Sequence, residues 1–457
     1  MEILIIGGGI AGLSTAYFLE QIASDAKVEV QIRILERTER LGGKICTVHD
    51  RGFLMEGGPD SFLVQKPWAA ELCRELGLAD ELVPANTEEK QVYQLRNGQL
   101  VPYPDGFRIA VPSAWGPFLR SPLLSWRGKA RVALERMVKR RPGLEDESVS
   151  SFLRRRIGRE AAETLAEPLM SGIHAADPEQ LSIRTTWPQL VEMERTSGSL
   201  LRGTAEREEA RSKDGSRAMF ESLRGGVGAL VDALRGRIQG EILTGASAGP
   251  VRKDGDRFEV DGRAADAVVV ATPAFEAATL LRTISAPLSA DLDAMRYVST
   301  ASVSLGYRAE DVRRELDAYG FIVPASEGRP ITACTWVSTK FAGRAPQDHV
   351  TLRAFMGRDG QEPDLARTDA ELNRTVCSEL SEILGIEAEP VAARVFRWPR
   401  GNPQYDVGHL DRVARIEDQA ESIPGLFLTG SAYWGGSVPD CIFQAMVTAE
   451  KVLVGQG

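Results

Sequence analysis

The chain has 457 residues, of which 43% are hydrophobic and 26% are charged, and its formal net charge at pH 7 is −9. This composition is typical of globular proteins and excludes collagen-like, disulfide-scaffold and wholly disordered chains; the length predicts two or three domains. The acidic balance argues against a general nucleic-acid binder.

The five cysteines are scattered and lack CxxC spacing, so we expect neither a disulfide framework nor a zinc site, and we expect a reducing compartment. The four histidines are also far apart in sequence, and we predict no metal site. The chain opens directly on a strand, which leaves no space for a cleavable signal, and no window approaches about 18 consecutive apolar residues. We therefore expect a cytoplasmic protein without a membrane-spanning helix.

The first predicted unit is a strand at 2–6, a helix at 10–24 and a strand at 28–36, with a GxGxxG motif at 7–12. In such a motif the first glycine makes a tight turn, the second lets the backbone approach a pyrophosphate, and the third lets the helix pack on the strand. The acidic residue that ends the second strand is placed to accept hydrogen bonds from a ribose. The predicted dinucleotide contacts are Gly7, Gly9, Ile10, Ala11, Gly12 and Glu36.

A second glycine turn follows at 36–44, with the sequence ERTERLGGK. A glycine pair after an arginine, just beyond the ribose-binding acid, resembles the second pyrophosphate- and ribityl-binding turn of glutathione-reductase-type flavoproteins. Units that bind NAD lack this turn, so it favours FAD; an ordinary solvated loop is the alternative. The predicted FAD contacts here are Arg37, Arg40, Gly42, Gly43 and Lys44.

Two further short apolar strands, near 268–270 and 426–428, run into small residues, as strands of one parallel sheet do. After the second strand, a glycine-rich stretch leads into a helix over 440–454, whose first amides can point at a flavin. Asp440 is alternatively only a helix N-cap. The predicted FAD contacts in these segments are Ala271, Gly430, Val438, Pro439, Asp440 and Ile442.

At five places the sequence carries motifs that are more specific than GxGxxG. They lie at 57–63 (GGPDSFL), 169–177 (LMSGIHAAD), 331–336 (ITACTW), 403–409 (PQYDVGH) and 439–442 (PDCI). Together they resemble the protoporphyrinogen oxidase family, and within it the Gram-positive branch that oxidises coproporphyrinogen III. The resemblance extends from end to end of the chain.

The resemblance implies a discontinuous α/β fold, with a Rossmann-like FAD-binding domain of the amine oxidase type, a mixed-sheet substrate domain and a helical insertion. The implied boundaries are 1–80, 218–275 and 406–457 for FAD binding, 81–109 and 276–405 for substrate binding, and 110–217 for the insertion. Within the insertion, the charged run at 205–217 predicts a mobile loop.

The resemblance also implies an enzyme that oxidises coproporphyrinogen III to coproporphyrin III by removing six electrons, with oxygen as acceptor and peroxide as product. Protoporphyrinogen IX is the alternative substrate. The alternatives of other classes are a different FAD amine oxidase or desaturase, and a flavin protein that binds porphyrin without turnover. Because a porphyrinogen is easily oxidised, such an enzyme needs no strong acid or base, which agrees with a sequence that shows no obvious catalytic dyad.

By position, the resemblance places Gly172, Ile173 and His174 against the tetrapyrrole, where backbone carbonyls receive its NH hydrogens. It places Trp336 on a pyrrole ring and Lys66 near a propionate. The alternatives are a polar wall for His174, a core position for Trp336 and a solvated surface position for Lys66. Further FAD contacts implied by the resemblance are Gly57, Gly58, Pro59, Asp60 and Val251.

The segment 120–159 contains twelve lysines or arginines and four acids, a net charge of +8 within an acidic chain. It predicts a solvated helical face, a membrane-facing surface, an electrostatic funnel for a carboxylated substrate, or a docking face for the next haem-pathway enzyme. The apolar stretch at 115–126 lies beside it, so peripheral membrane contact is a hypothesis.

Overall fold

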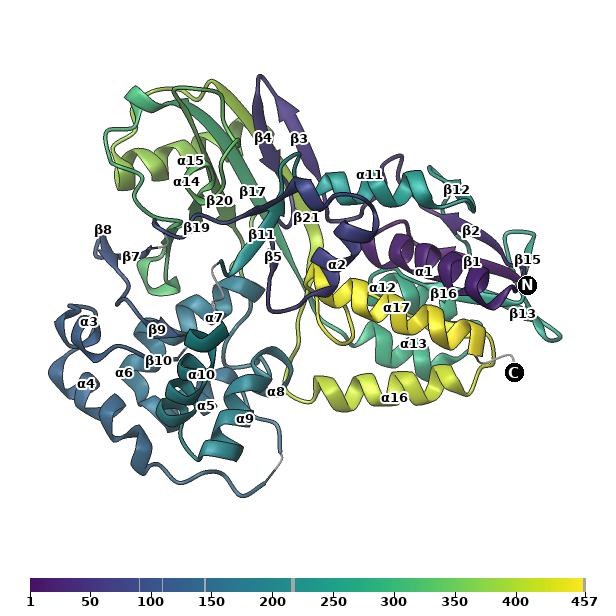
Figure 1. Cartoon of the computed structure of the whole chain (residues 1–457), viewed down its shortest axis with the longest axis horizontal. Helices are drawn as coiled ribbons and strands as arrows, with labels where there is room; N and C mark the ends of the chain where they lie inside the picture. Colours follow the sequence, from purple (N-terminus) through teal and green to yellow (C-terminus); the bar gives the residue numbers. More distant parts are fainter. Residues whose placement is uncertain (90, 109, 144, 215–217, 455–457) are drawn as a thin grey trace.

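The computed structural model describes residues 1–89, 91–108, 110–143, 145–214 and 218–454. Figure 1 shows an α/β part with both termini on the right, a sheet part at the upper left and a helical part at the lower left. The mixed α/β fold predicted from the sequence is confirmed. The division into domains at the boundaries given above stays a prediction.

The α/β part is built on a five-stranded parallel sheet. Its strands, in spatial order, are β12 (Glu241–Leu243), β2 (Gln31–Leu35), β1 (Glu2–Ile6), β16 (Ala267–Val270) and β22 (Leu426–Leu428). The prediction that distant segments form one parallel sheet is confirmed. β2 begins later than predicted, because the preceding helix runs to Ala26 and the chain then turns at the left-handed residue Lys27 (φ 57°).

Helices cover both faces of this sheet. They are α1 (Ile10–Ala26), α2 (Trp68–Glu75), α11 (Gly228–Arg237), α12 (Ala274–Leu281), α13 (Ala286–Asp293), α16 (His409–Glu421) and α17 (Val438–Val454). α1, α11 and α17 pack with Ile3 and Ile5 on one face, whereas α12, α13 and α16 pack with Leu4 and Ile6 on the other. This division follows from the alternation of side chains along a strand. α1 and α17 lie side by side (Figure 1).

The sheet part is a mixed seven-stranded sheet. Its strands, in spatial order, are β21 (Ala392–Pro403), β17 (Tyr297–Arg308), β20 (His349–Met356), β19 (Ile331–Trp336), β18 (Gly320–Ile322), β7 (Val92–Arg96) and β8 (Gln99–Pro102). One face packs on α15 (Asp369–Leu384) through a core that includes Ala354 and Val376. The other face looks toward the α/β part, where Arg353 donates to the Gly57 carbonyl. The strands and the helix predicted between 301 and 384 are present.

The helical part has its own core, which includes Phe118, Phe152 and Leu190. Its elements are α3 (Trp115–Arg120), α4 (Trp126–Ala133), the 3-10 turn η2 (Leu134–Met137), α5 (Val149–Ile157), α6 (Arg159–Ala161), the π-helical turn η3 (Ala162–Ala166), α7 (Glu167–His174), α8 (Ile183–Thr186), α9 (Pro188–Ser197) and α10 (Leu200–Asp214). Among the helices that the structure describes, none is both long enough and apolar enough to cross a membrane.

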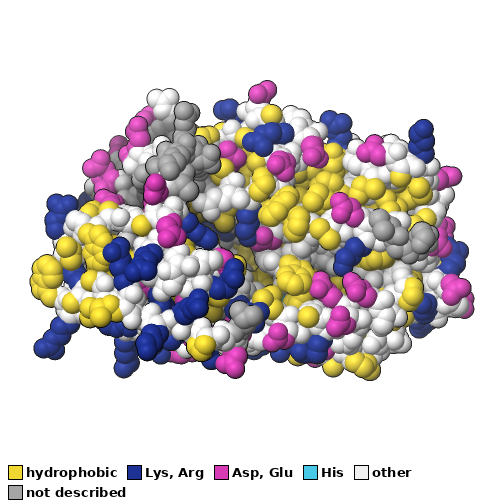
Figure 2. Space-filling view, turned by 60° about the horizontal axis from the view of Figure 1, so that its bottom comes forward, with side chains coloured by type: hydrophobic (Ala, Val, Ile, Leu, Met, Phe, Trp, Pro, Cys, Tyr) yellow, Lys and Arg dark blue, Asp and Glu magenta, His cyan; other side chains and the backbone are white. Residues whose placement is uncertain are grey.

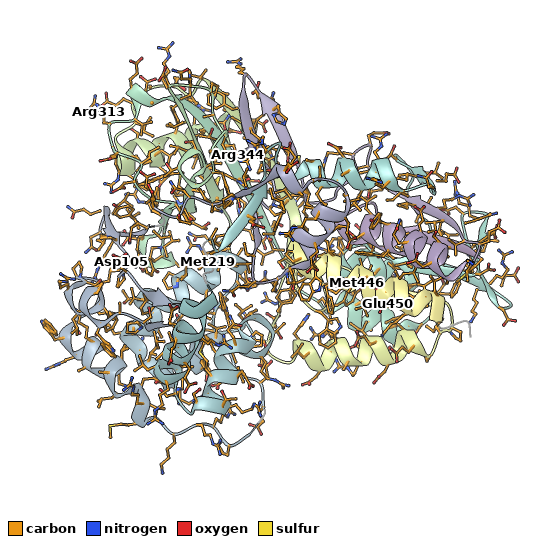
Figure 3. The ribbon with its side chains drawn as sticks, viewed as in Figure 1. Asp105, Met219, Arg313, Arg344, Met446 and Glu450 are labelled. Atoms are coloured by element: carbon orange, nitrogen blue, oxygen red, sulfur yellow. The ribbon has the colours of Figure 1, made fainter. Side chains whose placement is uncertain are left out.

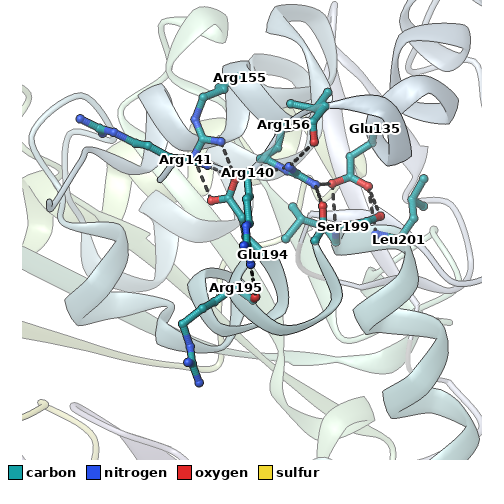
Figure 4. A network of polar contacts seen from close by, with 12 residues as sticks. Glu135, Arg140, Arg141, Arg155, Arg156, Glu194, Arg195, Ser199 and Leu201 are labelled. Carbon is teal, nitrogen blue, oxygen red and sulfur yellow. Dashed lines mark hydrogen bonds and ion pairs between the residues drawn. The ribbon is translucent and has the colours of Figure 1, made fainter. Parts of the chain in front are cut away.

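The prediction of a mobile loop over 205–217 is wrong, because α10 contains all of this run except its last three residues, which lie outside the described part. Two groups cap the start of α10. The hydroxyl of Ser199, the residue before the helix, accepts from the Arg202 amide at 3.3 Å. The Glu135 carboxylate accepts from the Leu200 amide at 2.8 Å and the Ser199 hydroxyl at 2.5 Å. Figure 4 shows the same carboxylate paired with the fully buried Arg156. The charged run itself is rich in Ala, Glu, Arg and Lys, which are strong helix formers.

The remaining described elements are short, and some of them lie between the three parts. They are β3 (Thr47–Asp50), β4 (Phe53–Glu56), β5 (Phe62–Leu63), η1 (Ala79–Glu81), β6 (Leu82–Pro84), β9 (Phe107–Arg108), β10 (Val111–Pro112), β11 (Phe220–Leu223), β13 (Arg252–Asp254), β14 (Arg257–Val260), β15 (Arg263–Ala265), η4 (Ala309–Asp311), η5 (Ala325–Glu327) and α14 (Val337–Lys340). β4 leads into the glycine turn at 57–60, and β5, directly after that turn, pairs with β11. These strands hold the turn between the α/β part and the sheet part.

Candidate functional site

Two glycines allow β1 to turn sharply into α1. Gly7 has a φ of +112°, and a Cβ on it would lie 2.8 Å from the carbonyl oxygen of Ala271. A Cβ on Gly12 would overlap the carbonyl oxygen of Gly7. A larger residue at either position would displace the backbone of the turn. Ala271, just after β16, thus closes the turn from the neighbouring strand.

The amino end of α1 has the features of an anion-binding site. Gly9 is the N-cap and supplies no side-chain cap, and the first turn contains no acidic residue. The amides of Ile10, Ala11 and Gly12 therefore lie at the positive end of the helix without helical acceptors. Within the described chain, a Cβ on Gly9 would come within 4 Å only of Gly43, at 3.8 Å. The two glycine turns lie side by side and form a backbone cradle that fits a pyrophosphate.

Glu36 is fixed beside this cradle. Its Oε2 accepts from the Gly8 amide at 2.8 Å, and its Oε1 accepts from the Thr38 amide at 2.9 Å and the Thr38 hydroxyl at 2.7 Å. A carboxylate has about four lone-pair sites, so acceptor capacity remains for a ribose hydroxyl. The position fits the predicted contact, and the role itself stays a prediction.

The two arginines of the second glycine turn have protein partners. Arg37 pairs with Glu276 at 2.7 Å, and its side chain is 60% exposed. Arg40 donates to the backbone carbonyl of Ile45 at 2.5 Å and also to that of Gly43. Arg40 therefore stabilises the glycine turn from within, whereas Arg37 is engaged at the surface.

Lys44 brings an uncompensated positive charge next to the cradle. Burial lowers the pKa of Lys44 to about 8. In the described part of the chain its ammonium group has no ion pair and no hydrogen bond. The Cys441 thiol acts on it electrostatically, but burial raises the pKa of that thiol to about 12, so the thiol is neutral. An unpaired cation at this position fits a negatively charged dinucleotide cofactor.

A third glycine turn, Gly57–Gly58, is packed against the second. A Cβ on Gly58 would overlap the Lys44 carbonyl oxygen. From the sheet part, Arg353 donates to the carbonyl oxygens of Gly57 at 2.6 Å and Gly58 at 2.7 Å, and the Trp398 indole donates to that of Gly57 at 2.9 Å. The sequence carries no local signal for these long-range contacts, and both Arg353 and Trp398 were missed.

Asp60 fixes the end of this turn through an ion pair with Lys340, whose Nζ lies 3.0 and 3.1 Å from the two carboxylate oxygens. Burial alone would raise the pKa of Asp60, but the charges of Lys340 and Arg353 outweigh it and lower that pKa to about 2. Ser222 donates to the Asp60 carbonyl at 2.7 Å and accepts from the buried Arg344, labelled in Figure 3, at 2.8 Å. Asp60 thus positions the turn.

The start of α17 is capped by its own side chains. Ser437 is the residue before the helix, and its hydroxyl lies 2.5 Å from Asp440, which is therefore the third residue of the helix and not its N-cap. Lys66 donates to both carboxylate oxygens of Asp440, at 2.6 and 2.7 Å. Lys66 is thus ion-paired, and its predicted contact with a propionate stays a prediction. Val438 and Ile442, 6% and 1% exposed, pack into the core.

Two residues among the predicted contacts, Val251 and Trp336, have their side chains in cores. Val251 is 0% exposed, its amide donates to the Leu280 carbonyl at 2.8 Å, and its carbonyl accepts from the Thr283 hydroxyl at 2.7 Å. Trp336 is 0% exposed and lies on the face of β19 that packs on α15. Because side chains alternate along a strand, the side chain of its neighbour Thr335 lies on the opposite face, which is turned toward the α/β part. The alternative core position of Trp336 is the correct one.

The predicted porphyrinogen-contacting stretch is the last turn of α7. The helix ends at His174, and Ala175 is left-handed (φ 52°). Gly172 and Ile173 are exposed, Ile173 by 64%. Burial of the His174 ring and the charge of Lys66 lower the pKa of His174 to about 4. His174 is therefore neutral at pH 7, and the end of α7 is an uncharged wall with an exposed apolar side chain.

The glycine turns, the acid directly after β2 and the unpaired Lys44 could hold a flavin, and the comparison with protein families agrees that the chain has one. The family described as flavin containing amine oxidoreductase matches residues 10–453. The chain belongs to this family. Its cofactor is therefore a flavin.

Similar members of the amine oxidoreductase family span the whole chain. The coproporphyrinogen III oxidase of Bacillus subtilis (strain 168) is 33% identical over 463 residues, which cover 99% of this chain and 98% of the relative. The enzyme of the same name from Staphylococcus aureus is 30% identical and covers 99% of both chains. Protoporphyrinogen oxidase 1 of Arabidopsis thaliana chloroplasts is 29% identical and covers 99% of this chain and 88% of the relative.

Solved structures of the family have the same fold. The crystal structure of an Exiguobacterium protein, described provisionally as a protoporphyrinogen oxidase, aligns with a TM-score of 0.88 and 32% identity over 99% of this chain and 98% of the other. A variant of putrescine oxidase aligns with a TM-score of 0.69 and 18% identity over 99% of this chain and 98% of the other. This likeness shows the fold alone. The predicted amine oxidase fold is confirmed.

Proposed function

We propose that this member of the amine oxidoreductase family binds FAD and oxidises coproporphyrinogen III to coproporphyrin III, with oxygen as acceptor and peroxide as product. The observation that carries the proposal is the similarity to the Bacillus subtilis coproporphyrinogen III oxidase, 33% identity over 99% of the chain. Similarity of this extent includes the helical part and the sheet part as well as the nucleotide-binding turns, so it is not limited to the flavin frame.

The contacts of the glycine turns support FAD as the particular flavin. The amides at the start of α1 and the turn at Gly42–Gly43 provide two backbone surfaces for a pyrophosphate, and Lys44 offsets its charge. Glu36 is fixed where its carboxylate can accept hydrogen bonds from the hydroxyls of an adenosine ribose. Bound FAD supplies the electron acceptor that none of the side chains provides.

The chain's own task is to position and enclose a substrate that is easily oxidised. Ile173 offers an apolar contact, and Gly172 leaves space beside it, since a Cβ there would meet no described atom within 4 Å. The neutral His174 adds no charge to this wall. The last carbonyls of α7 lack helical donors. That of His174 accepts from the Gln404 side chain at 3.3 Å, whereas those of Gly172 and Ile173 are available to the N–H groups of a porphyrinogen.

Protoporphyrinogen IX is the second candidate substrate. The plant relatives that match this chain at 29% identity are named protoporphyrinogen oxidases. The two porphyrinogens differ in charge, since coproporphyrinogen III carries four propionates and protoporphyrinogen IX carries two. A cationic side chain near the tetrapyrrole therefore favours the first candidate.

Side-by-side aerobic turnover of the two porphyrinogens by the flavin-loaded protein tests the proposal, with porphyrin fluorescence and peroxide as readouts. A larger kcat/KM for coproporphyrinogen III supports it. A larger value for protoporphyrinogen IX favours the second candidate, and turnover of neither by fully loaded protein rejects both.

We further propose that the protein is cytoplasmic and makes peripheral contact with an anionic membrane surface. All five cysteines are free thiols, which fits a reducing compartment. Trp126, Leu134 and Met137 lie on α4 and η2 with 71%, 52% and 78% exposure. Arg127 and Arg136 lie among them and have no ion pair in the described part of the chain. Figure 2 shows hydrophobic and basic side chains together at the left end, where the helical part lies.

The rest of the basic segment is less cationic than its sequence predicts. Arg154 pairs with Glu179 at 2.6 Å, Arg155 pairs with Glu194 at 2.6 Å, and Arg156 is fully buried (Figure 4). The free positive charge is thus concentrated beside the exposed apolar side chains, the arrangement of a membrane-surface helix.

Flotation with liposomes at low salt tests this contact. We expect the wild-type protein to float with anionic but not with neutral liposomes, and we expect W126S to float less. Complete recovery of the wild-type protein in the unbound fraction contradicts the proposal and leaves the surface as a docking face for the next haem-pathway enzyme.

A further inference from the structure

We infer that Arg358 anchors a carboxylate of the porphyrinogen substrate, an inference that rests on the proposed function. Arg358 begins a tight turn just after β20. Its amide donates to the Gln361 carbonyl at 3.3 Å, and the Gln361 amide donates to the Arg358 carbonyl at 2.9 Å. Gly360, with a φ of +74°, makes this turn possible.

This turn is fixed against the end of α7. The Asp359 amide donates to the carbonyl of Ala175 at 2.8 Å, directly after the stretch predicted to contact the porphyrinogen. The Asp359 carboxylate binds Arg296 at 2.9 Å, and Arg296 binds both carboxylate oxygens of Asp406, at 2.8 and 2.9 Å. Arg358 therefore has a defined place beside the wall formed by α7.

The guanidinium of Arg358 is half-buried and has few partners. Its one hydrogen bond in the described chain runs from Nη2 to the Val323 carbonyl at 3.3 Å, and its buried Nε has no partner. Burial lowers the pKa of Arg358, and no acid in the described part opposes that effect. Most of its five N–H donors are therefore available.

Two other buried arginines show the contrast. Arg353 donates to backbone carbonyls at 2.6 and 2.7 Å, and Arg344 donates to backbone carbonyls at 2.9 and 3.0 Å. Both use their guanidinium groups to hold the chain together. Arg358, with one long hydrogen bond, stabilises the fold much less and keeps a planar fork of donors free.

A planar guanidinium binds a carboxylate through two parallel hydrogen bonds. A propionate at this position would satisfy the free donors and offset the cost of burying the charge. Lys66, whose charge acts on His174, is already engaged by Asp440. Arg358 thus supplies an unpaired positive charge that can bind one of the four propionates of coproporphyrinogen III.

The test uses the flavin-loaded protein and its R358Q variant. We expect the Kd for coproporphyrin III, followed by porphyrin fluorescence, and the KM for coproporphyrinogen III to rise roughly 10- to 100-fold in R358Q. We expect kcat to stay within about twofold, because the contact lies away from the reacting atoms. R313Q is the control: Arg313 lies at the outer end of the sheet part (Figure 3), its side chain is 73% exposed, and both constants should be unchanged.

Coproporphyrin III tetramethyl ester, which lacks the negative charges, separates charge recognition from packing. We expect wild type and R358Q to bind the ester equally. An unchanged Kd and KM in R358Q, or an equal loss of affinity for the acid and the ester, overturns the inference.

Two controls keep this result distinct from the proposed function. Failure of wild type to oxidise either porphyrinogen rejects that function, whereas the titration with coproporphyrin III still decides the role of Arg358. If R358Q does not retain flavin, R358K replaces it, because lysine keeps the charge but lacks the planar fork. We expect R358K to bind coproporphyrin III several-fold more weakly than wild type; unchanged affinity overturns the inference.

Discussion

Arg353 donates to the carbonyl oxygen of Gly58 at 2.7 Å, although the two residues are 295 positions apart in sequence. The contact joins the seven-stranded sheet to a glycine turn that packs on the flavin cradle. Separation of the two parts would leave a buried guanidinium without acceptors, which is costly. The position of the flavin site therefore depends on the sheet part as well as on the nucleotide-binding turns.

Replacement of Arg353 by methionine removes this contact. We expect R353M to lower the free energy of unfolding by about 1.5–3 kcal/mol and to weaken flavin binding, because hydrogen bonds from a charged donor are lost. Denaturant unfolding and flavin titration measure the two effects, and R313M, at an exposed site, should match wild type. Wild-type stability and flavin affinity in R353M would contradict this role of Arg353.

A valine at position 12 should abolish flavin binding, because even a Cβ on Gly12 overlaps the Gly7 carbonyl oxygen. The matched control is Gly236→Ala in α11, where a Cβ would meet no described atom within 4 Å. We expect the control to keep its flavin and to be as stable as wild type or slightly more so. A full flavin absorption spectrum in purified G12V protein would show that the first glycine turn is not part of the flavin site.

Lys44 gives the flavin-free protein a distinctive pH dependence. Its pKa falls from 10.5 to about 8 on folding, so between these pH values the unfolded chain binds more protons than the folded one. The free energy of unfolding of the apoprotein should therefore rise with pH in this window. Urea unfolding of wild type and K44M measures the difference. Parallel pH profiles would show that the Lys44 ammonium is not buried.

Flavin binding provides the complementary test of Lys44. Because FAD carries a negatively charged pyrophosphate, we expect K44M to bind FAD about tenfold more weakly. K44R keeps the charge and should retain more affinity than K44M. Equal affinity in all three proteins would place the pyrophosphate away from Lys44.

The ion pair of Asp60 and Lys340 stabilises the third glycine turn. The pKa of Asp60 is lowered from 3.8 to about 2, so the pair contributes stability above pH 3.8 that is lost as the pH falls toward 2. We expect K340M to unfold about 3–5 kcal/mol more easily at pH 7, because it leaves a largely buried carboxylate unpaired. The double variant D60N/K340M should recover part of this loss. A K340M protein as stable as wild type would mean that water solvates Asp60.

The parts of the candidate site that are formed by residues adjacent in sequence could be predicted from the sequence. The strand, the glycine turn and the helix at 2–26 are set by consecutive residues, and Glu36 follows the second strand directly. Arg353 and Trp398 were not predicted, since their partner Gly57 is 296 and 341 residues away and only the folded sheet brings them together. Nothing in the order of residues indicates that contact.

Strand register explains the core position of Trp336. The sequence predicted β19 correctly, but a shift of one residue exchanges the two faces of a strand. Which face packs on α15 depends on pairing with β20, where Trp336 lies opposite Leu352. The error at 205–217 has a partly similar origin, because the Glu135 carboxylate adds to the local N-cap of α10, Ser199. Local composition alone does not show a cap supplied from elsewhere in the chain.

Anaerobic addition of coproporphyrinogen III to the flavin-loaded protein tests the central claim most directly. The account predicts that the absorption band of oxidised flavin disappears as coproporphyrin III is formed, and that admission of oxygen restores the band and produces peroxide. A flavin band that persists while the tetrapyrrole binds would contradict the account and would describe a porphyrin-binding flavoprotein without turnover.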